Sequence, residues 1–125
     1  MVNNMDDNVQ LTPEQREAIS EIDRNLQIIA CAGSGKTEVI TRRIANILQR
    51  KSGIKPENIV AFTFTEKAAD SMKKRIAKAL NAQDLTNIGH MYVGTIHGFC
   101  YHLLNKYTEQ FREYRILDSV KLVEG

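Results

Sequence analysis

The chain has 125 residues, a length that fits one domain or part of one. Hydrophobic residues make up 42% and charged residues 26%, the profile of a soluble globular protein, and the formal net charge is only +2. No apolar stretch is long enough to span a membrane and the N-terminus is too polar for a secretory signal, so we expect a cytoplasmic location without membrane association. The two cysteines lie far apart and indicate neither a disulfide framework nor a metal site.

The chain opens with a polar lead over residues 1–10, which we expect to be flexible. A helix is predicted to follow, with Thr12 as its N-cap and Pro13 at its first position. Gln15 stands three residues after Thr12 and completes a capping box. Asn25 is expected to end this first amphipathic element.

A strand, a turn and a helix are predicted next. The apolar run Leu26–Ala30 is a candidate for a buried strand, and Gly33–Gly35 supplies a turn. Hydrophobic residues at helical spacing then predict a helix over Thr37–Arg50. Further along, a second strand is expected over Ile59–Phe64, and Thr65 is expected to cap the helix that follows it.

A third strand is predicted over Met91–Ile96, after a polar loop, and a third long helix over His97–Tyr107. Strand–helix alternation with short turns favours a parallel sheet with crossover helices, that is, an α/β fold. Beyond these elements, Tyr114–Leu117 is predicted to be either a short strand or a packed extended segment.

The turn between the first strand and its helix has the residues of a phosphate-binding loop. Its glycines let successive backbone N–H groups point at phosphate oxygens, and the helix N-terminus adds partial positive charge. Lys36 would reach the β- and γ-phosphates of a nucleoside triphosphate, and the Thr37 hydroxyl would bind Mg²⁺. The general pattern has glycine six residues before the lysine, where a small alanine stands here. The loop consists of Ala30, Cys31, Ala32, Gly33, Ser34, Gly35, Lys36 and Thr37.

Two side chains near this loop have two readings each. The Gln15 amide carries a donor and an acceptor that can pair with the adenine edge, but its capping role alone would also account for it. Cys31 is a reactive thiol near a helix N-terminus or, more often in such positions, a small buried filler.

Four segments in order match the motifs of one enzyme family. Leu11–Ile19 resembles the Q motif of UvrD/Rep/PcrA-type superfamily 1 DNA helicases, and Ile28–Thr37 resembles their motif I, where alanine at the first glycine position is usual. Ile59–Ala69 resembles their motif Ia. Val93–Cys100 resembles the next DNA-contacting motif, in a form also seen in RecB- and AddA-like relatives.

The resemblance implies a P-loop NTPase domain of RecA-like type, with a parallel sheet in a truncated three-layer α/β/α arrangement. Residues 11–97 would form its N-terminal part, and residues 98–125 would begin an inserted helical subdomain. The implied activity is an ATP- and Mg²⁺-driven motor that moves along single-stranded DNA, usually 3′ to 5′, and separates duplex at single-strand/double-strand junctions. Gln15 would contact adenine, and Lys36 and Thr37 would be catalytic.

The resemblance also places DNA contacts at the carboxyl ends of two strands, where ligands collect in open α/β sheets. Phe64 would stack on a base, although an ordinary core aromatic is an equally good reading of this residue. The implied DNA contacts are Thr63, Phe64, Thr65, Lys67, Thr95 and His97.

Some features depart from the family pattern. Many relatives have arginine at the position of Glu38 and asparagine at that of Glu66, and an acid in a DNA-contacting motif weakens a phosphate contact. No Asp-Glu dipeptide occurs, although these motors use one to hold Mg²⁺ and activate water. We therefore expect a fragment of a longer helicase that is inactive alone and self-associates through unpaired strand edges. The alternative is a P-loop module that binds a nucleotide without hydrolysing it.

Overall fold

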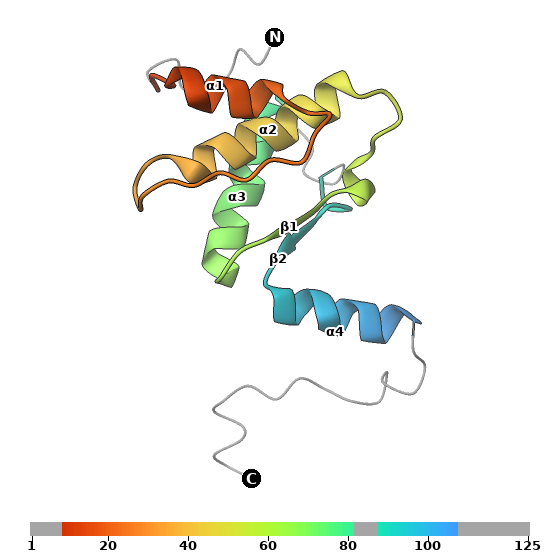
Figure 1. Ribbon diagram of the computed structural model, residues 1–125. Coiled ribbons are helices and arrows are strands. Elements are labelled where there is room, and N and C mark those ends of the chain that lie inside the picture. The colour runs from red at the N-terminus through yellow and green to blue at the C-terminus, as the bar shows by residue number, and fades with distance from the viewer. Residues whose placement is uncertain (1–8, 82–87, 108–125) are drawn as a thin grey trace.

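The computed structural model describes residues 9–81 and 88–107 (Figure 1). The predicted strand or extended segment at Tyr114–Leu117 and most of the predicted subdomain lie outside these residues. No helix in the two described ranges is long and apolar enough to cross a membrane. In chain order the elements are α1 (Pro13–Ser20), α2 (Lys36–Arg50), the 3-10 helix η1 (Pro56–Asn58), β1 (Val60–Phe62), α3 (Glu66–Ala79), β2 (Tyr92–Gly94) and α4 (Ile96–Tyr107).

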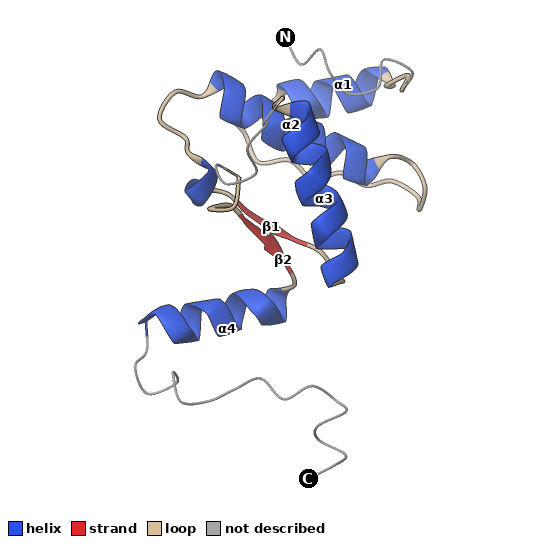
Figure 2. Ribbon diagram, turned by 180° about the vertical axis from the view of Figure 1, so that it is seen from behind, coloured by secondary structure: helices blue, strands red, loops and turns tan. Residues whose placement is uncertain are grey.

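The strands β1 and β2 form a two-stranded parallel sheet in which Ala61 is paired with Val93. The crossover between them contains α3, which begins with a local signal: the Thr65 hydroxyl accepts a hydrogen bond from the Ala68 backbone N–H at 3.1 Å. This arrangement confirms the predicted α/β organisation with parallel strands and a crossover helix (Figure 2).

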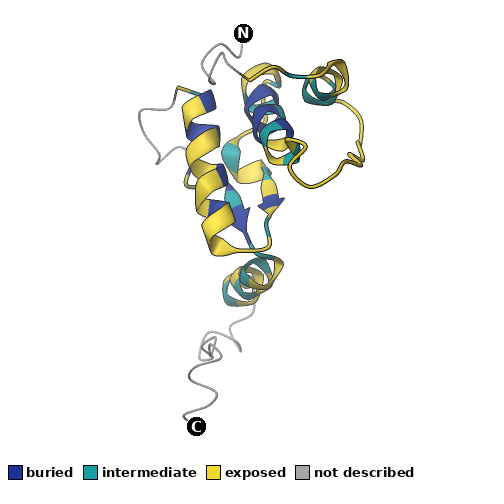
Figure 3. Ribbon diagram, turned by 90° about the vertical axis from the view of Figure 1, so that its left-hand side faces the viewer, coloured by how far each residue is buried: buried dark blue, intermediate teal, exposed yellow. Residues whose placement is uncertain are grey.

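The core lies between the sheet and the inner faces of α2 and α3. Ala61 and Val93 point into it from the paired strands, and Ile44 of α2 joins Met72 and Ile76 of α3. The buried residues of α3 follow one face of that helix, as helical hydrophobic periodicity requires, whereas those of α2 extend around the helix because both α1 and α3 pack on it (Figure 3).

Helix α1 packs on α2 and is joined to it by polar contacts as well. The buried Asn46 side chain donates to the carbonyl oxygen of Ile19 at 2.9 Å, and the Arg43 guanidinium donates to the carbonyl oxygen of Arg24 at 3.0 Å. The first contact satisfies a carbonyl in the last turn of α1, which a helix leaves without an intrahelical partner, and the second holds the segment that follows α1.

The strand predicted over Leu26–Ala30 is wrong for this structure. The segment runs as an irregular, exposed stretch beside α2, and the side chain of Ile29 is 87% exposed (Figure 1). A strand persists only as part of a hydrogen-bonded ladder, and no strand among the described residues lies against this segment. The two observed strands are also shorter than predicted, because Thr65 and Thr95 already cap the starts of the following helices and the pairing ends with the hydrogen bond from the Thr63 N–H to the Gly94 carbonyl.

The three-layer arrangement is likewise incomplete in the part of the chain that the structure describes. Helix α3 packs on the sheet face that carries Ala61 and Val93, and Ile44 of α2 joins the same cluster. The opposite face carries Val60 and Phe62, which remain 46% and 47% exposed, and only α4 reaches it, through the ring of Phe99. One face is therefore packed and the other is partly open.

Candidate functional site

The glycine loop forms a tight turn directly before α2. Gly33 and Gly35 have φ angles of +76° and +85°, the left-handed region that glycine enters without steric cost. Between them the Ser34 backbone N–H donates to the carbonyl oxygen of Cys31 at 3.2 Å, and the Ser34 hydroxyl donates to the same oxygen. Gly35 is the N-cap residue of α2, and no side chain caps this helix. The loop therefore presents an uncapped helix N-terminus, the kind of backbone that binds anions.

Lys36, the first residue of α2, folds back across this loop. Its Nζ donates to the carbonyl oxygen of Ala30 at 2.6 Å, so the ammonium group lies over the turn and not in open solvent. The Thr37 side chain is exposed one position further on, and the Thr37 carbonyl accepts a hydrogen bond from the Thr41 hydroxyl at 2.7 Å. An anion at the turn could replace the Ala30 carbonyl as the partner of the ammonium, with the Thr37 hydroxyl beside it.

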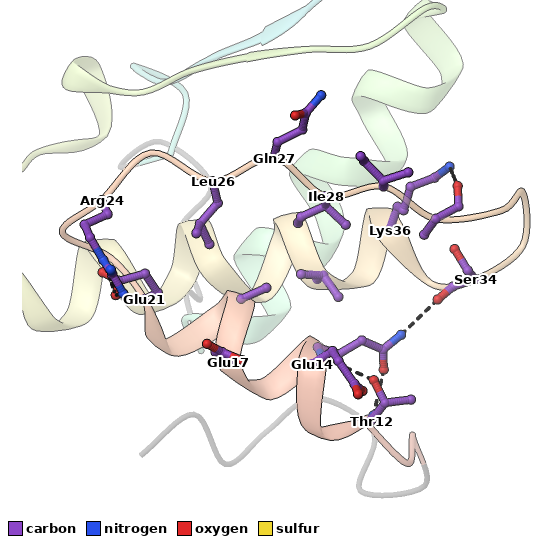
Figure 4. Close-up of a pocket in the computed structure, with 15 residues that line it drawn as sticks. Thr12, Glu14, Glu17, Glu21, Arg24, Leu26, Gln27, Ile28, Ser34 and Lys36 are labelled. Carbon is purple, nitrogen blue, oxygen red and sulfur yellow. Dashed lines mark hydrogen bonds and ion pairs between the residues drawn. The ribbon is translucent and has the colours of Figure 1, made fainter.

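Gln15 ties α1 to the loop. The predicted capping box is confirmed, because Gln15 Oε1 accepts from the Thr12 backbone N–H at 2.9 Å and the Thr12 hydroxyl accepts from the Gln15 N–H at 3.2 Å. Gln15 Nε2 also donates to the carbonyl oxygen of Ser34 at 2.9 Å (Figure 4). Each end of an amide can make two hydrogen bonds, so one donor and one acceptor of Gln15 remain for another partner.

A cavity of about 440 Å³ opens between α1, the irregular segment before the loop and the start of α2 (Figure 4). Its size is within the range of small-ligand sites. The apolar side chains of Leu26 and Ile28 line one wall, while Ser34 and Lys36 stand at the end nearest the loop. A flat ring with an anionic tail would fit such a slot.

The other end of this cavity is lined by an ion pair. The Arg24 guanidinium donates two hydrogen bonds to Glu21 Oε2, at 2.7 and 3.0 Å. The hydrogen bond from Arg24 lowers the pKa of the Glu21 carboxyl, and the same contact raises the pKa of Arg24. The Arg24 charge is therefore neutralised by Glu21 at this end of the cavity. Lys36, at the end nearest the loop, is the cation in position to bind an anionic ligand.

The carboxyl ends of β1 and β2 bring together two segments that are far apart in the chain. The Thr63 N–H, just after β1, donates to the carbonyl oxygen of Gly94 at 2.9 Å. The Thr95 hydroxyl, just after β2, accepts from the Gly98 N–H at 3.1 Å and donates to Glu66 Oε1 at 3.3 Å. We call this place the sheet edge: it comprises residues 63–67 and 95–98.

The side chains predicted to contact DNA gather at the sheet edge with different exposures. The Phe64 side chain is 102% exposed, so the reading of this residue as a core aromatic is wrong. Lys67 and His97 are also exposed, whereas the hydroxyls of Thr65 and Thr95 accept hydrogen bonds from the starts of α3 and α4. The reading of Cys31 as a buried filler is wrong too, since this thiol is exposed on the loop.

Three hydrogen bonds at the phosphate loop and at the sheet edge involve partners that sequence motifs do not reveal. They are Ser34 as acceptor of Gln15, Ala30 as acceptor of Lys36, and Glu66 as acceptor of Thr95. The first and third join residues 19 and 29 positions apart. The only sequence signal for the third is an acidic residue directly before Lys67 in a segment expected to bind phosphate.

The junction between β2 and α4 depends on two glycines under one aromatic ring. The Tyr92 hydroxyl donates to the carbonyl oxygen of Thr95 at 2.8 Å. A Cβ atom at Gly94 or at Gly98 would lie 2.8 Å from this hydroxyl oxygen, well inside van der Waals contact. The ring packs against Phe99 with centroids 4.9 Å apart, so it cannot move aside freely.

We expect Gly98→Ala to lower the free energy of unfolding by about 1–3 kcal/mol, because the new methyl group overlaps the Tyr92 hydroxyl. Tyr92→Phe removes that oxygen and should restore most of the loss in the double variant, although alone it costs about 1 kcal/mol through its hydrogen bond. Urea unfolding of the three variants and the wild type forms a double-mutant cycle. Additive costs would contradict this account of the junction.

Comparison with known proteins shows the family to which the chain belongs. The parallel sheet with its crossover helix defines an α/β protein, and the order of its motifs indicates a DNA helicase domain. The chain belongs to the family described as UvrD/REP helicase N-terminal domain, whose profile matches residues 11–123.

Proteins similar to the chain are much longer than it is. "ATP-dependent DNA helicase SRS2" of Saccharomyces cerevisiae is 35% identical over 117 residues, which cover 90% of this chain and 10% of that protein. "DNA helicase II" of Salmonella typhimurium is 39% identical over 87% of the chain and 15% of its own length. "ATP-dependent DNA helicase PcrA" of Bacillus subtilis is 39% identical over 87% of the chain and 14% of its own length. The chain thus spans about a seventh or less of these relatives.

Proposed function

We propose that this chain is the part of a DNA helicase that binds Mg²⁺-ATP and single-stranded DNA, built as the first portion of a RecA-like P-loop domain. The relatives are named DNA helicases, and two of them are named ATP-dependent. The helicase would use ATP hydrolysis to move along one strand, 3′ to 5′, and to open duplex at single-strand/double-strand junctions.

The observation that carries the proposal is the contact between Gln15 and the loop. Its amide donates to the Ser34 carbonyl, two residues before Lys36, and thereby holds a base-reading group and a phosphate-binding loop on one cavity. The remaining donor and acceptor of Gln15 match N7 and N6 of adenine, whereas guanine offers two acceptors on that edge. Adenine would lie against α1, and the triphosphate would extend toward Lys36.

The triphosphate end of the site fits the residues present. The uncapped start of α2 and the Lys36 ammonium would hold the β- and γ-phosphates, and the exposed Thr37 hydroxyl would bind the Mg²⁺ that neutralises them. No Asp-Glu pair is present to hold the metal and activate water, so we propose that the 125-residue chain alone binds ATP without steady-state turnover.

The DNA part of the proposal rests on the sheet edge. Phe64 is fully exposed there and can stack on a base, while Lys67 and His97 can approach the backbone phosphates. The hydroxyls of Thr63, Thr65 and Thr95 lie along the same edge. The open sheet face with Val60 and Phe62 would favour self-association of the isolated chain.

The alternative is a P-loop module that binds a nucleotide only as a structural ligand. The missing Asp-Glu pair favours it for this chain by itself, and the family membership favours the motor for the protein as a whole. A module of this kind would have no use for the exposed Phe64 and Lys67, so DNA binding separates the two functions.

Discrimination between ATP and GTP tests the nucleotide site. We expect the wild type to bind Mg²⁺-ATP about tenfold more tightly than Mg²⁺-GTP in isothermal titration calorimetry. Gln15→Ala should remove most of that preference by weakening ATP alone. Gln27→Ala is the matched control, because Gln27 borders the same cavity but points away from α1 (Figure 4). Equal weakening of both nucleotides by Gln15→Ala would show that this residue only supports the fold.

A further inference from the structure

An acidic side chain lies in the middle of the sheet edge. Glu66 is the first residue of α3, and its Oε1 accepts a hydrogen bond from the Thr95 hydroxyl at 3.3 Å. A Cβ atom at Gly98 would lie 3.8 Å from the same oxygen, so the carboxylate also stands beside the first turn of α4. Glu66 itself is exposed and accessible to a ligand.

Two helix N-termini meet at this carboxylate. Helices α3 and α4 begin directly after β1 and β2, and their partial positive charges both favour an anion there. Burial, followed by the negative charge of Glu66, raises the pKa of Tyr92, whose ring packs under the junction. Among the described residues, no ion pair joins Glu66 to a lysine or an arginine.

The groups around Glu66 are ones that a DNA phosphate would also use. A phosphate passing the sheet edge would seek the same hydroxyl of Thr95 and the same helix N-termini, with Lys67 as the adjacent cation. A carboxylate and a phosphate cannot share these donors without repulsion.

We propose that Glu66 is an intramolecular competitor of the DNA backbone. Its carboxylate would occupy the Thr95 hydroxyl and the starts of the two helices until a phosphate of single-stranded DNA displaces it. The inference rests on the proposed DNA-binding function and adds a residue that sets the affinity of that site. Glu66 would keep the affinity of the sheet edge for each DNA phosphate low, so that single-stranded DNA can move along this site.

The size of the effect follows from Coulomb's law. Two unit charges about 4–6 Å apart in water repel one another enough to weaken binding by about three- to fivefold. Glu66→Gln removes the charge and keeps an oxygen that can still accept from Thr95, so folding should be preserved. The variant should bind single-stranded DNA about three- to fivefold more tightly than the wild type at low salt, and salt should narrow this gap.

The test is a fluorescence anisotropy titration of a labelled oligothymidylate with the 125-residue chain, at low and at moderate salt. Glu57→Gln is the matched control: it makes the same charge change at an exposed site in η1, before the opposite end of β1. Thermal unfolding of each variant, followed by circular dichroism, verifies that all three proteins are equally folded.

Tighter binding by Glu66→Gln with unchanged binding by Glu57→Gln would support the competitor role. Equal gains in the two variants, or no gain in either while the wild type binds, would overturn this role and leave the DNA-binding function in place. If neither the wild type nor Glu66→Gln binds, the proposed DNA-binding function fails together with the inference.

Discussion

Lys36→Ala is expected to weaken Mg²⁺-ATP binding by about one to two orders of magnitude, the largest effect of any single substitution in the cavity. The ammonium is the cation at the loop end, and a charge-assisted hydrogen bond of this kind contributes about 1.5–3 kcal/mol. Without it, the triphosphate meets only backbone N–H groups and the helix N-terminus. The affinity is measured by titration calorimetry, with ADP in parallel.

The same substitution should leave the fold intact. Lys36 gives up one hydrogen bond to the Ala30 carbonyl at the surface of the loop, and water can replace the ammonium there. Thermal unfolding of Lys36→Ala should therefore resemble that of the wild type. Lys73→Ala, which removes an exposed lysine from α3, is the control for a loss of net charge. Unchanged ATP affinity in Lys36→Ala would place the nucleotide elsewhere and refute the proposed site.

Elements specified by neighbouring residues could be predicted from the sequence. The capping box of Thr12 and Gln15 and the start of α3 at Thr65 are confirmed, because N-caps act over three residues. The long helices α2 and α3 follow from hydrophobic periodicity in the same way, within one or two residues at their ends. A glycine turn before Lys36 is also local, since positive φ angles favour glycine.

Features that depend on distant partners could not be predicted. The apolar run Leu26–Ala30 has the composition of a buried strand, yet whether it pairs depends on a neighbouring strand that its own residues do not specify. Asn46 lies on the side of α2 that faces α1, and its burial is tolerated because its side chain donates to the Ile19 carbonyl, 27 residues earlier. Phe64 has the residue type of a core side chain, but the turn into α3 leaves it exposed.

The two candidate sites also differ in whether neighbouring or distant residues form them. The phosphate loop is contiguous, so its residues could be listed from the sequence, and only the contacts of Gln15 and Lys36 required a structure. The sheet edge is assembled from two segments that are joined only when β1 and β2 pair in register. Its acidic residue, Glu66, therefore acquires a role only once Thr95 lies beside it.

The sheet edge depends directly on α3, and Ile76 is the residue that anchors this helix. Its side chain is fully buried, at 0% exposure, in the cluster formed by α2, α3 and both strands. We expect Ile76→Ala to lower the free energy of unfolding by about 2–5 kcal/mol, because it removes buried methyl groups and leaves a cavity. Small domains have only about 5–15 kcal/mol in total, so the variant should be partly unfolded at moderate temperature.

Two controls separate packing from residue type. Ile76→Val removes one methylene and should cost about 0.5–1.5 kcal/mol, while Ile40→Ala makes the full truncation at a site on α2 that is 39% exposed. Urea unfolding followed by circular dichroism ranks the three variants. If Ile40→Ala were as destabilising as Ile76→Ala, the packing of α3 against the sheet would not be the main hydrophobic core. In that event the sheet edge would not be held by α3, and the contact of Glu66 with Thr95 would lack the rigid support that its competition with DNA requires.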